Sequence, residues 1–595
     1  MNTFRELLAS LRDHLSGRRT TVAAFLFYPA LAMLLYGGVI AHPSTTYIGD
    51  GHDPAAYIWS MVWWPYAVSH RLNPFITRVI WTPSGFNLTW AAAIPGPSFI
   101  LSPITRWLGP VVSFNTLMIF IPATVSWSTF LPCRRISGQF YPSLLGGYLF
   151  GFSPYMIGHM HMGQPNLTLI FGVPICLHLV LLRLDGAIGR IMFVAMLAIA
   201  LALQFFVSTE IVALMTLFGG ASLGLALLVL PMDQRLVVRR AIPLVALAYV
   251  VFAILVSPYL YYAFAYGVPE QMHPVEKCSA DLLGYLVPSQ MLLFGGGTFW
   301  RLSNTLTPHV WYTGKGIYAN PALLVILLLY ARRHWRTGAG KLLLLASLMV
   351  VVCSFGPYLH VANRPLLVLP WRWIMKVPTL NKALPVRFPM FFYLCISIMA
   401  SIVLSERSIR RSFRTALAGL SVLLLLPSRH YIRTLPQQVD TPDFFNASIL
   451  DAHVKRGDTL LILPFSIQGT SLLWQAQTDM YFNMVGGYVS TYVPEDFRRW
   501  PVVAMMLGDE PGPDLVNQLK PFLAHYQVKG IVLAPEAQPK WRGPISELGV
   551  DQEEVGGVLF YPIGGSAEST GRSGHEPGAS LPRGLHQIDP IARGV

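Results

Sequence analysis

The sequence has few charged residues for its length. Only 12% of the 595 residues are Asp, Glu, Lys or Arg, whereas 53% are hydrophobic. A soluble globular protein needs more charged surface than this, so the composition excludes a soluble fold and predicts a polytopic membrane protein. Acidic residues are the scarcer kind, 29 against 43 basic ones. The basic residues form short clusters between apolar runs, which is typical of cytoplasmic loops and argues against a nucleic-acid-binding surface.

Cysteine is also rare. The five cysteines lie mostly inside or beside apolar runs, and their spacing indicates neither a metal site nor a disulfide framework. The sequence has no repeat of solenoid length, and it lacks the G-x-G-x-x-G and Walker spacings, so nothing in it indicates ATP. The apolar run at 22–40 is too long for the core of a cleavable signal peptide and is expected to remain as a spanning helix.

Apolar segments of spanning length predict a polytopic α-helical domain at 21–428 with about eleven transmembrane helices. Residues 1–20 form a cytoplasmic lead-in, and the piece at 96–107 is too short to cross and is expected to be re-entrant. The predicted helices lie near 21–41, 110–131, 141–158, 165–183, 190–208, 211–231, 241–264, 314–331, 342–362, 386–405 and 412–428.

The distribution of basic residues orients these helices. With the N-terminus in the cytoplasm, every inner loop is basic, as the positive-inside rule requires. The loops 42–95, 265–313 and 363–385 then lie outside. We therefore expect an integral protein of a bacterial inner (plasma) membrane, with its C-terminal region extracytoplasmic.

From residue 429 onward the pattern changes. Buried strands are predicted near 458–464, 528–533 and 557–562, and an amphipathic helix near 514–526. These elements predict a small extracytoplasmic α/β domain at 429–563. The remaining 564–595, rich in Gly, Ser, Pro and Arg, is predicted to be a disordered tail.

Two carboxylates, Asp50 and Asp53, follow the first span in the run Gly-Asp-Gly-His-Asp-Pro. A carboxylate beside the hydrocarbon is costly unless water, a cation or a substrate meets it, so the pair is a candidate site. Asp53 before Pro54 also fits a helix N-cap, and Asp50 between two glycines fits a turn. These interpretations are compatible with a site, because a helix start also attracts phosphate. The Trp- and Tyr-rich helix that follows is expected to lie in the membrane interface.

The outer loop after residue 362 is basic, contrary to the orientation rule. Its five cations have no Asp or Glu among them, and such a set favours a lipid phosphate or pyrophosphate. Ordinary headgroup contact or a miscounted span would also explain it. Arg387 is the preferred ligand, because it opens a predicted span, and Lys382 accompanies it. The five are Arg364, Arg372, Lys376, Lys382 and Arg387.

Other polar residues fall on the same predicted side. Glu210 lies between two apolar runs and is either a turn residue or a group facing a cavity. His159 and His161 occupy the next outer loop together with Gln164; they do not share a helix face, so hydrogen bonding is favoured over metal binding. Lys315 follows the loop at 265–313, and that loop is long enough to bind substrate.

Taken together, Asp50-Gly-His-Asp53 after the first span, the helix behind it, the many spans and an outer C-terminal domain resemble the GT-C superfamily of integral membrane glycosyltransferases. The resemblance implies transfer of a sugar from a polyprenyl-phosphate donor to a glycan, lipid or protein acceptor, with inversion. One of the two acids would be the general base, while the other orients the acceptor or holds a divalent cation such as Mg or Mn. Arg387, Lys382 and Lys315 would meet the leaving phosphate, and Trp and Tyr rings of the first outer loop would stack on sugars.

Two other classes of function remain open. A flippase or transporter of lipid-linked sugars would need charged groups within the spans, and the predicted spans contain almost none. A non-catalytic protein of envelope assembly would bind partners through the C-terminal domain and need none of the loop carboxylates.

Overall fold

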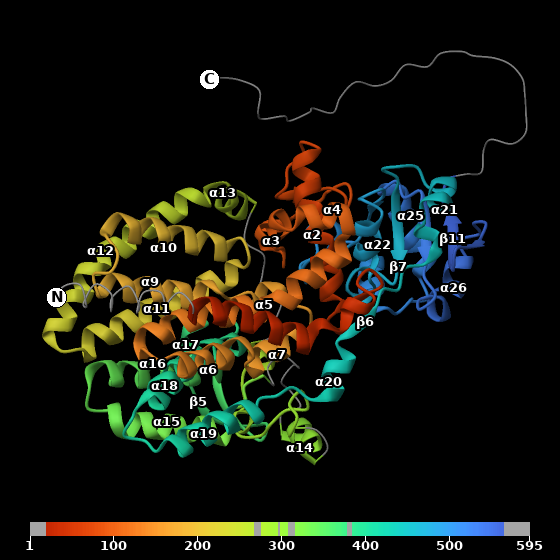
Figure 1. Cartoon of the computed structure of the whole chain (residues 1–595). Coiled ribbons are helices and arrows are strands. Elements are labelled where there is room, and N and C mark those ends of the chain that lie inside the picture. The colour runs from red at the N-terminus through yellow and green to blue at the C-terminus, as the bar shows by residue number, and fades with distance from the viewer. Residues whose placement is uncertain (1–19, 267–274, 296–297, 307–315, 378–382, 565–595) are drawn as a thin grey trace, which may run out of the picture.

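The computed structural model describes residues 20–266, 275–295, 298–306, 316–377 and 383–564. A large set of helices makes up one part, and a mixed sheet with its own helices lies beside one end of it (Figure 1). The main helices after the first one at 20–41 are α5 (Pro110–Ser137), α6 (Phe140–Gly151), α9 (Gly172–Leu184), α10 (Arg190–Phe205), α11 (Thr209–Val229), α12 (Met232–Leu255), α15 (Pro321–His334), α16 (Gly338–Ser354), α18 (Pro389–Ser405) and α19 (Arg411–Leu423).

Six helices in the described part of the chain are long and apolar enough to cross a membrane: Thr20–Ala41, Pro110–Ser137, Pro165–Leu184, Thr209–Val229, Met232–Leu255 and Pro385–Ser405. The membrane character of the fold is therefore supported, while the number eleven stays a prediction. Several predicted spans differ in the structure, and the one at 241–264 is divided between α12, which already begins at Met232, and α13 (Ser257–Ala265). The segment at 141–158 is broken into α6 and α7 (Pro154–His161), because Pro154 lacks an N–H and Ser153 caps the new helix.

The predicted span at 342–362 is also shorter than expected. Helix α16 ends at Ser354, and Gly356, with a φ of 68°, turns the chain before Pro357. The chain then forms a hairpin of β4 (Tyr358–Val361) and β5 (Arg364–Val368). The second half of the predicted span is thus a sheet element.

Helix α18 is the centre of the helical part. It packs against α5, α6, α15 and α16. In the span Pro385–Ser405, 89% of the most apolar 18-residue stretch is buried inside the protein. By contrast, only 11% of the corresponding apolar stretch of α12 is buried, as expected of an apolar helix that faces lipid. The residue that opens the α18 segment, Arg387, therefore lies among packed helices.

The strands predicted after residue 429 are present in a five-stranded sheet of order β10–β11–β9–β7–β8. Strand β7 (Thr459–Leu463) runs parallel to β8 (Asn483–Met484) and β9 (Gly530–Leu533), and all five residues of β7 are buried, as its continuous apolar run predicts. Strands β10 (Glu553–Val555) and β11 (Val558–Pro562) are antiparallel to their neighbours. The helix predicted near 514–526 is α25 (Leu515–His525).

The sheet part is fixed to the first outer loop through helix α2 (Asp53–Ser69), which packs on α22 (Ser471–Gln477). The indole Nε1 of Trp59 donates to Gln475 Oε1 at 2.7 Å, and the fully buried Gln475 amide donates to the carbonyls of Val79 and Phe482 at 3.0 and 2.7 Å. Trp59 also stacks on Trp63, and both are 1% exposed. The expectations that this helix lies in the membrane interface and stacks its rings on sugars are therefore wrong for these tryptophans, because the protein itself covers them.

Candidate functional site

The loop that carries the two acids is held by a short sheet and by one buried amide. Strand β1 (Thr46–Ile48) pairs antiparallel with β6 (Pro436–Gln438). Asn115 of α5 accepts a hydrogen bond from the Ile48 N–H at 3.1 Å and donates to the Thr46 carbonyl at 2.7 Å. This amide is 3% exposed, so it fixes the end of β1 against the central helices.

Two glycines let this loop touch the loop that follows α7. The backbone N–H of Asp50 donates to the His161 carbonyl at 2.7 Å. Gly49 and Gly163 have φ values of 129° and 61°, and a Cβ on Gly49 would lie 2.7 Å from the Gly163 Cα. Neither position has room for a side chain, so the two loops approach at backbone contact.

The two acids have different surroundings. The Asp50 side chain is 57% exposed; it accepts from the Gly51 N–H at 2.8 Å and lies 3.7 Å from His161 Nε2. Asp50 is therefore a turn residue whose side chain accepts from the next backbone N–H, as one of the two interpretations predicted. Asp53 is the first residue of α2 and makes no side-chain capping bond, so the N-cap interpretation is wrong. Its carboxylate instead accepts a hydrogen bond from Gln164, and the Tyr488 hydroxyl lies near it.

A chain of hydrogen bonds leads inward from Asp53. Gln164, which precedes α8 (Pro165–Thr168), donates Nε2 to Asp53 Oδ2 at 2.5 Å. Its Oε1 lies 2.7 Å from His159 Nδ1. Because that oxygen only accepts, the network assigns the proton to Nδ1 and leaves Nε2 of His159 as an acceptor.

The neutral tautomer of His159 agrees with its electrostatics. The ring is fully buried, and its Nε2 faces the Arg387 Nη1 at 3.4 Å. Burial and the positive charge of Arg387 lower the pKa of His159 to about 3. His159 is therefore neutral, and it accepts a hydrogen bond from Arg387 while it donates one to Gln164, which in turn donates to Asp53.

The inner end of the chain is an ion pair. Arg387, at the end of η7 (Pro385–Arg387), donates Nε to Glu210 Oε1 at 3.1 Å, and their side chains are 12% and 33% exposed. Glu210 lies in the first turn of α11, whose start Ser208 caps. The prediction that Arg387 is an uncompensated cation is wrong, because Glu210 reaches it from 177 residues away.

The histidines lie elsewhere than expected. Both are in the last turn of α7 and not in a loop, and they point to different partners: His159 to Gln164 and Arg387, His161 toward Asp50. Burial lowers the pKa of His161, and the Asp50 carboxylate partly opposes this. Lys315 and Lys382 lie outside the described residues.

Sequence reasoning missed Tyr488. It follows β8 in the sheet part and lies close to Asp53; burial and the Asp53 charge raise the pKa of Tyr488. The run Gly486-Gly-Tyr488 has no feature that marks a site in the sequence. The C-terminal region thus supplies a side chain to the acid of the first loop.

In the described part of the chain, no three His, Cys, Asp or Glu side chains gather in a way that would hold a metal ion. Asp50 and Asp53 are two carboxylates at the start of α2, and Mg²⁺ is usually bound by one or two carboxylates when a substrate phosphate and water complete its shell. They fit a cation only in that shared mode.

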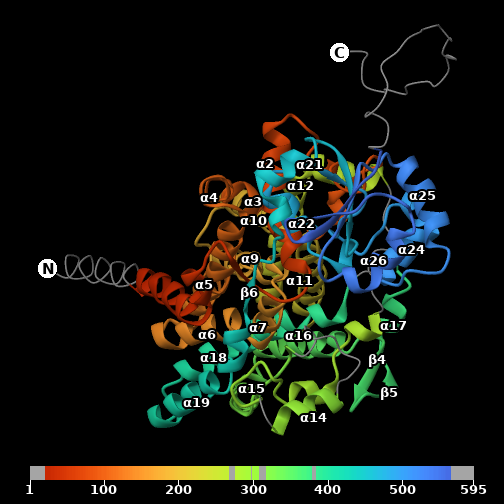
Figure 2. The same cartoon turned by 90° about the vertical axis from the view of Figure 1, so that its right-hand side faces the viewer.

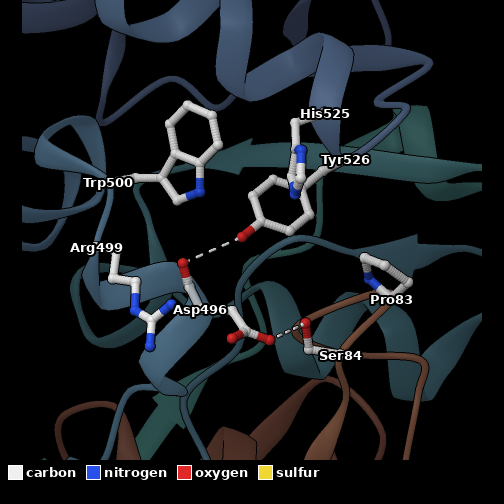
Figure 3. Close-up of a pocket in the computed structure, with 7 residues that line it drawn as sticks. All are labelled: Pro83, Ser84, Asp496, Arg499, Trp500, His525 and Tyr526. Carbon is white, nitrogen blue, oxygen red and sulfur yellow. Dashed lines mark hydrogen bonds between the residues drawn. The ribbon is translucent and has the colours of Figure 1, made fainter.

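A hollow of about 380 Å³ lies apart from these residues (Figure 3). It is lined by the turn at Pro83 and Ser84 and by the sheet part, where Ser84 donates to Asp496 at 2.9 Å and Tyr526 donates to the Asp496 carbonyl at 3.3 Å. None of the predicted site residues lines it, so its side chains serve the contact between the first outer loop and the sheet part.

Comparison with known proteins places the fold. No family model matches the sequence, and no curated protein matches it. Among solved structures, the arabinofuranosyltransferase AftD from Mycobacteria superposes with a TM-score of 0.56 at 14% identity over 92% of this chain and 40% of that chain. A mutant AftD, R1389S class 2, gives 0.53 at 14% identity, over 93% and 42%. ArnT from Cupriavidus metallidurans, bound to undecaprenyl phosphate, gives 0.45 at 12% identity over 92% and 99%.

The similarity to AftD concerns the fold alone. The chain spans about two fifths of the length of AftD, and over that length the two proteins share their fold.

Proposed function

We propose that the protein is a GT-C membrane glycosyltransferase that moves a sugar from a polyprenyl-phosphate donor to an acceptor on the extracytoplasmic side. The observation that carries the proposal is the hydrogen-bonded chain from Asp53 through Gln164 and His159 to Arg387. It places a carboxylate and a guanidinium at the two ends of one polar network, as transfer from a phosphate leaving group requires. AftD, which shares the fold, is an arabinofuranosyltransferase, and this supports the same class of reaction.

Asp53 is the general base in this proposal. The acceptor hydroxyl gives its proton to the carboxylate while its oxygen attacks the anomeric carbon, and the bond from that carbon to the phosphate oxygen breaks with its electron pair leaving on the phosphate. This single displacement inverts the anomeric centre. Gln164 holds the carboxylate in place, and this fixed orientation favours Asp53 over the exposed Asp50.

Arg387 stabilises the departing phosphate. A guanidinium carries five N–H donors, so Arg387 can hold Glu210 and His159 and still donate to phosphate oxygens. Its burial strengthens that interaction, because little water screens the charge. Lys382 and Lys315 are proposed to assist it.

Asp50 and the metal have secondary roles. Asp50 orients the acceptor, or shares a divalent cation (Mg or Mn) with Asp53 and the donor phosphate; such a cation would neutralise phosphate charge. His161 stays beside Asp50 and bonds acceptor hydroxyls. The acceptor is a glycan, a lipid or a protein, and the protein resides in the inner membrane with its C-terminal region outside.

The test is transfer of radiolabelled sugar from polyprenyl-phosphate-linked pentoses and hexoses by the purified protein in lipid vesicles. We expect Asp53→Asn to lower the rate about 100-fold or more, the usual worth of a general base, and Asp50→Asn to lower it less. An Asp53→Asn variant with the full rate of the wild type would show that this carboxylate is not the base. The flippase function is favoured if the wild type transfers no sugar but moves lipid-linked sugar across the vesicle bilayer, and if Asp53→Asn and Arg387→Gln leave that movement intact.

A further inference from the structure

The segment of residues 358–377, here called the hairpin segment, has an unusual surface. It contains β4, β5 and the short helix α17 (Trp371–Ile374). All five residues of β5 are exposed, and Leu366 and Leu367 are 65% and 59% exposed although they point to opposite faces of the strand. Val368, Trp373 and Val377 are exposed as well. Among the described residues, therefore, none covers either face of β5.

A hairpin with apolar side chains exposed on both faces is not expected to be stable in water. An isolated two-stranded hairpin is at best marginally stable there, and contiguous exposed apolar side chains of this kind mark an interaction surface. The hairpin is nevertheless fixed at its turn: the buried Asp281 carboxylate accepts the N–H groups of Ala362 and Asn363 at 3.3 and 2.9 Å. Its exposure is thus a built feature of the fold.

The charges of the segment point to what covers it. Arg364, Arg372 and Lys376 are exposed among the apolar residues, and the segment has no Asp or Glu. Exposed Leu and Val together with Trp and basic side chains are the composition of a membrane interface, where rings sit at headgroup level and cations meet lipid phosphates. Figure 2 shows β4, β5 and α17 at the rim of the helical part, where the bilayer would surround it.

The geometry points to a bilayer anchor: we propose that the hairpin segment inserts its apolar side chains into the outer leaflet of the membrane while Arg364, Arg372 and Lys376 bind anionic headgroups. The open edge of β5 still needs hydrogen-bond partners, which places the strand at the headgroup boundary and not in the hydrocarbon core. Pro365 removes one donor from that strand. The proposal is independent of the reaction catalysed.

The experiment is depth-dependent quenching on the full-length protein in vesicles. A fluorophore is attached to Leu367→Cys and, separately, to Trp373→Cys, and quenched either by nitroxide lipids or by aqueous iodide. Leu228→Cys on α11, 76% exposed on a candidate span, is the matched control for lipid contact, and the exposed Lys520→Cys on α25 is the control for water. Labelling of the wild type gives the background from its own cysteines.

We expect both hairpin labels to be quenched by nitroxide lipids, as at Leu228→Cys, and protected from iodide. Iodide quenching equal to that at Lys520→Cys would overturn the proposal, and so would protection from both quenchers, which would mean that a protein covers the segment. Lipid quenching should also rise when phosphatidylglycerol replaces phosphatidylcholine, and the triple variant Arg364→Gln, Arg372→Gln, Lys376→Gln should abolish that rise. If lipid quenching in the wild type did not rise with phosphatidylglycerol, the proposed binding of anionic headgroups by the three cations would be overturned.

Discussion

Glu210→Gln is the perturbation that best separates positioning from charge at Arg387. A glutamine can still accept the Nε hydrogen bond that Glu210 accepts at 3.1 Å. Only the negative charge is lost. If Arg387 binds a lipid phosphate, that charge competes with the ligand, and its removal should tighten phosphate binding while the guanidinium stays in place.

The magnitude follows from the exposure of the pair. Two unit charges about 4 Å apart interact by about 4 kcal/mol at the effective dielectric constant of a protein surface. Glu210 is 33% exposed, so water screens part of this, and we expect roughly 1–2 kcal/mol to become available to the ligand. At 1.4 kcal/mol for each factor of ten, this is roughly a 5- to 30-fold tighter Kd. The unliganded variant should be less stable, because it buries a less compensated cation.

The assay is binding of farnesyl phosphate to the protein in detergent, with farnesol as the ligand that lacks the charge. Glu210→Gln should tighten farnesyl phosphate only, and Arg387→Gln should abolish the difference between the two ligands. The matched control is Glu406→Gln, which removes the same charge from a pair with Arg333 at 2.7 Å. Unchanged or weaker phosphate binding by Glu210→Gln, or equal tightening by Glu406→Gln, would refute the reasoning.

Three further predictions follow from the same contacts. The pKa of His159 is about 3 in the folded protein and about 6.5 in the unfolded protein, so the unfolded state binds more protons and the free energy of unfolding falls as the pH is lowered below 6.5. From pH 7 to pH 5 this loss should be about 2 kcal/mol. Denaturant unfolding of His159→Gln should lack that share of the pH dependence. Gln475→Leu removes two buried hydrogen bonds that join the sheet part to the first outer loop and one within the sheet part, and should cost roughly 2–4 kcal/mol. Early proteolytic release of the sheet part would show this, while Gln468→Leu on the exposed surface should leave it resistant. Chelation by EDTA should abolish transfer, with Mg²⁺ or Mn²⁺ restoring it, if the cation shared by Asp50 and Asp53 is required; full activity in EDTA would remove the metal from the mechanism.

Part of the fold could be predicted because its signals are local. Apolar length and the placement of basic residues gave the membrane class and the approximate positions of α11, α12 and α18, and continuous apolar runs gave β7 and β9. The end of α16 and the break before α7 were misjudged, because hydropathy windows weigh composition and pass over one glycine or proline that ends a helix.

The site was only partly predictable, for a different reason. Single ionisable residues near apolar runs stand out, so Asp53, His159, Gln164, Glu210 and Arg387 could each be named. Their pairing depends on how distant helices meet, which no local pattern encodes: Glu210 and Arg387 join the starts of α11 and α18. Tyr488 could not be found at all, since a tyrosine in a loop carries no signal until the sheet part is placed against α2.

The pairing of β1 with β6 has a consequence for biosynthesis. Thr46 leaves the ribosome early, whereas its partner Gln438 is made almost four hundred residues later. At roughly 5–20 residues per second, the nascent chain waits roughly 20–80 s before the loop bearing Asp53 can be closed. Until β6 is made, β1 lacks its pairing strand, and of the contacts described above only those with Asn115 and the His161 carbonyl hold the loop that bears the two acids.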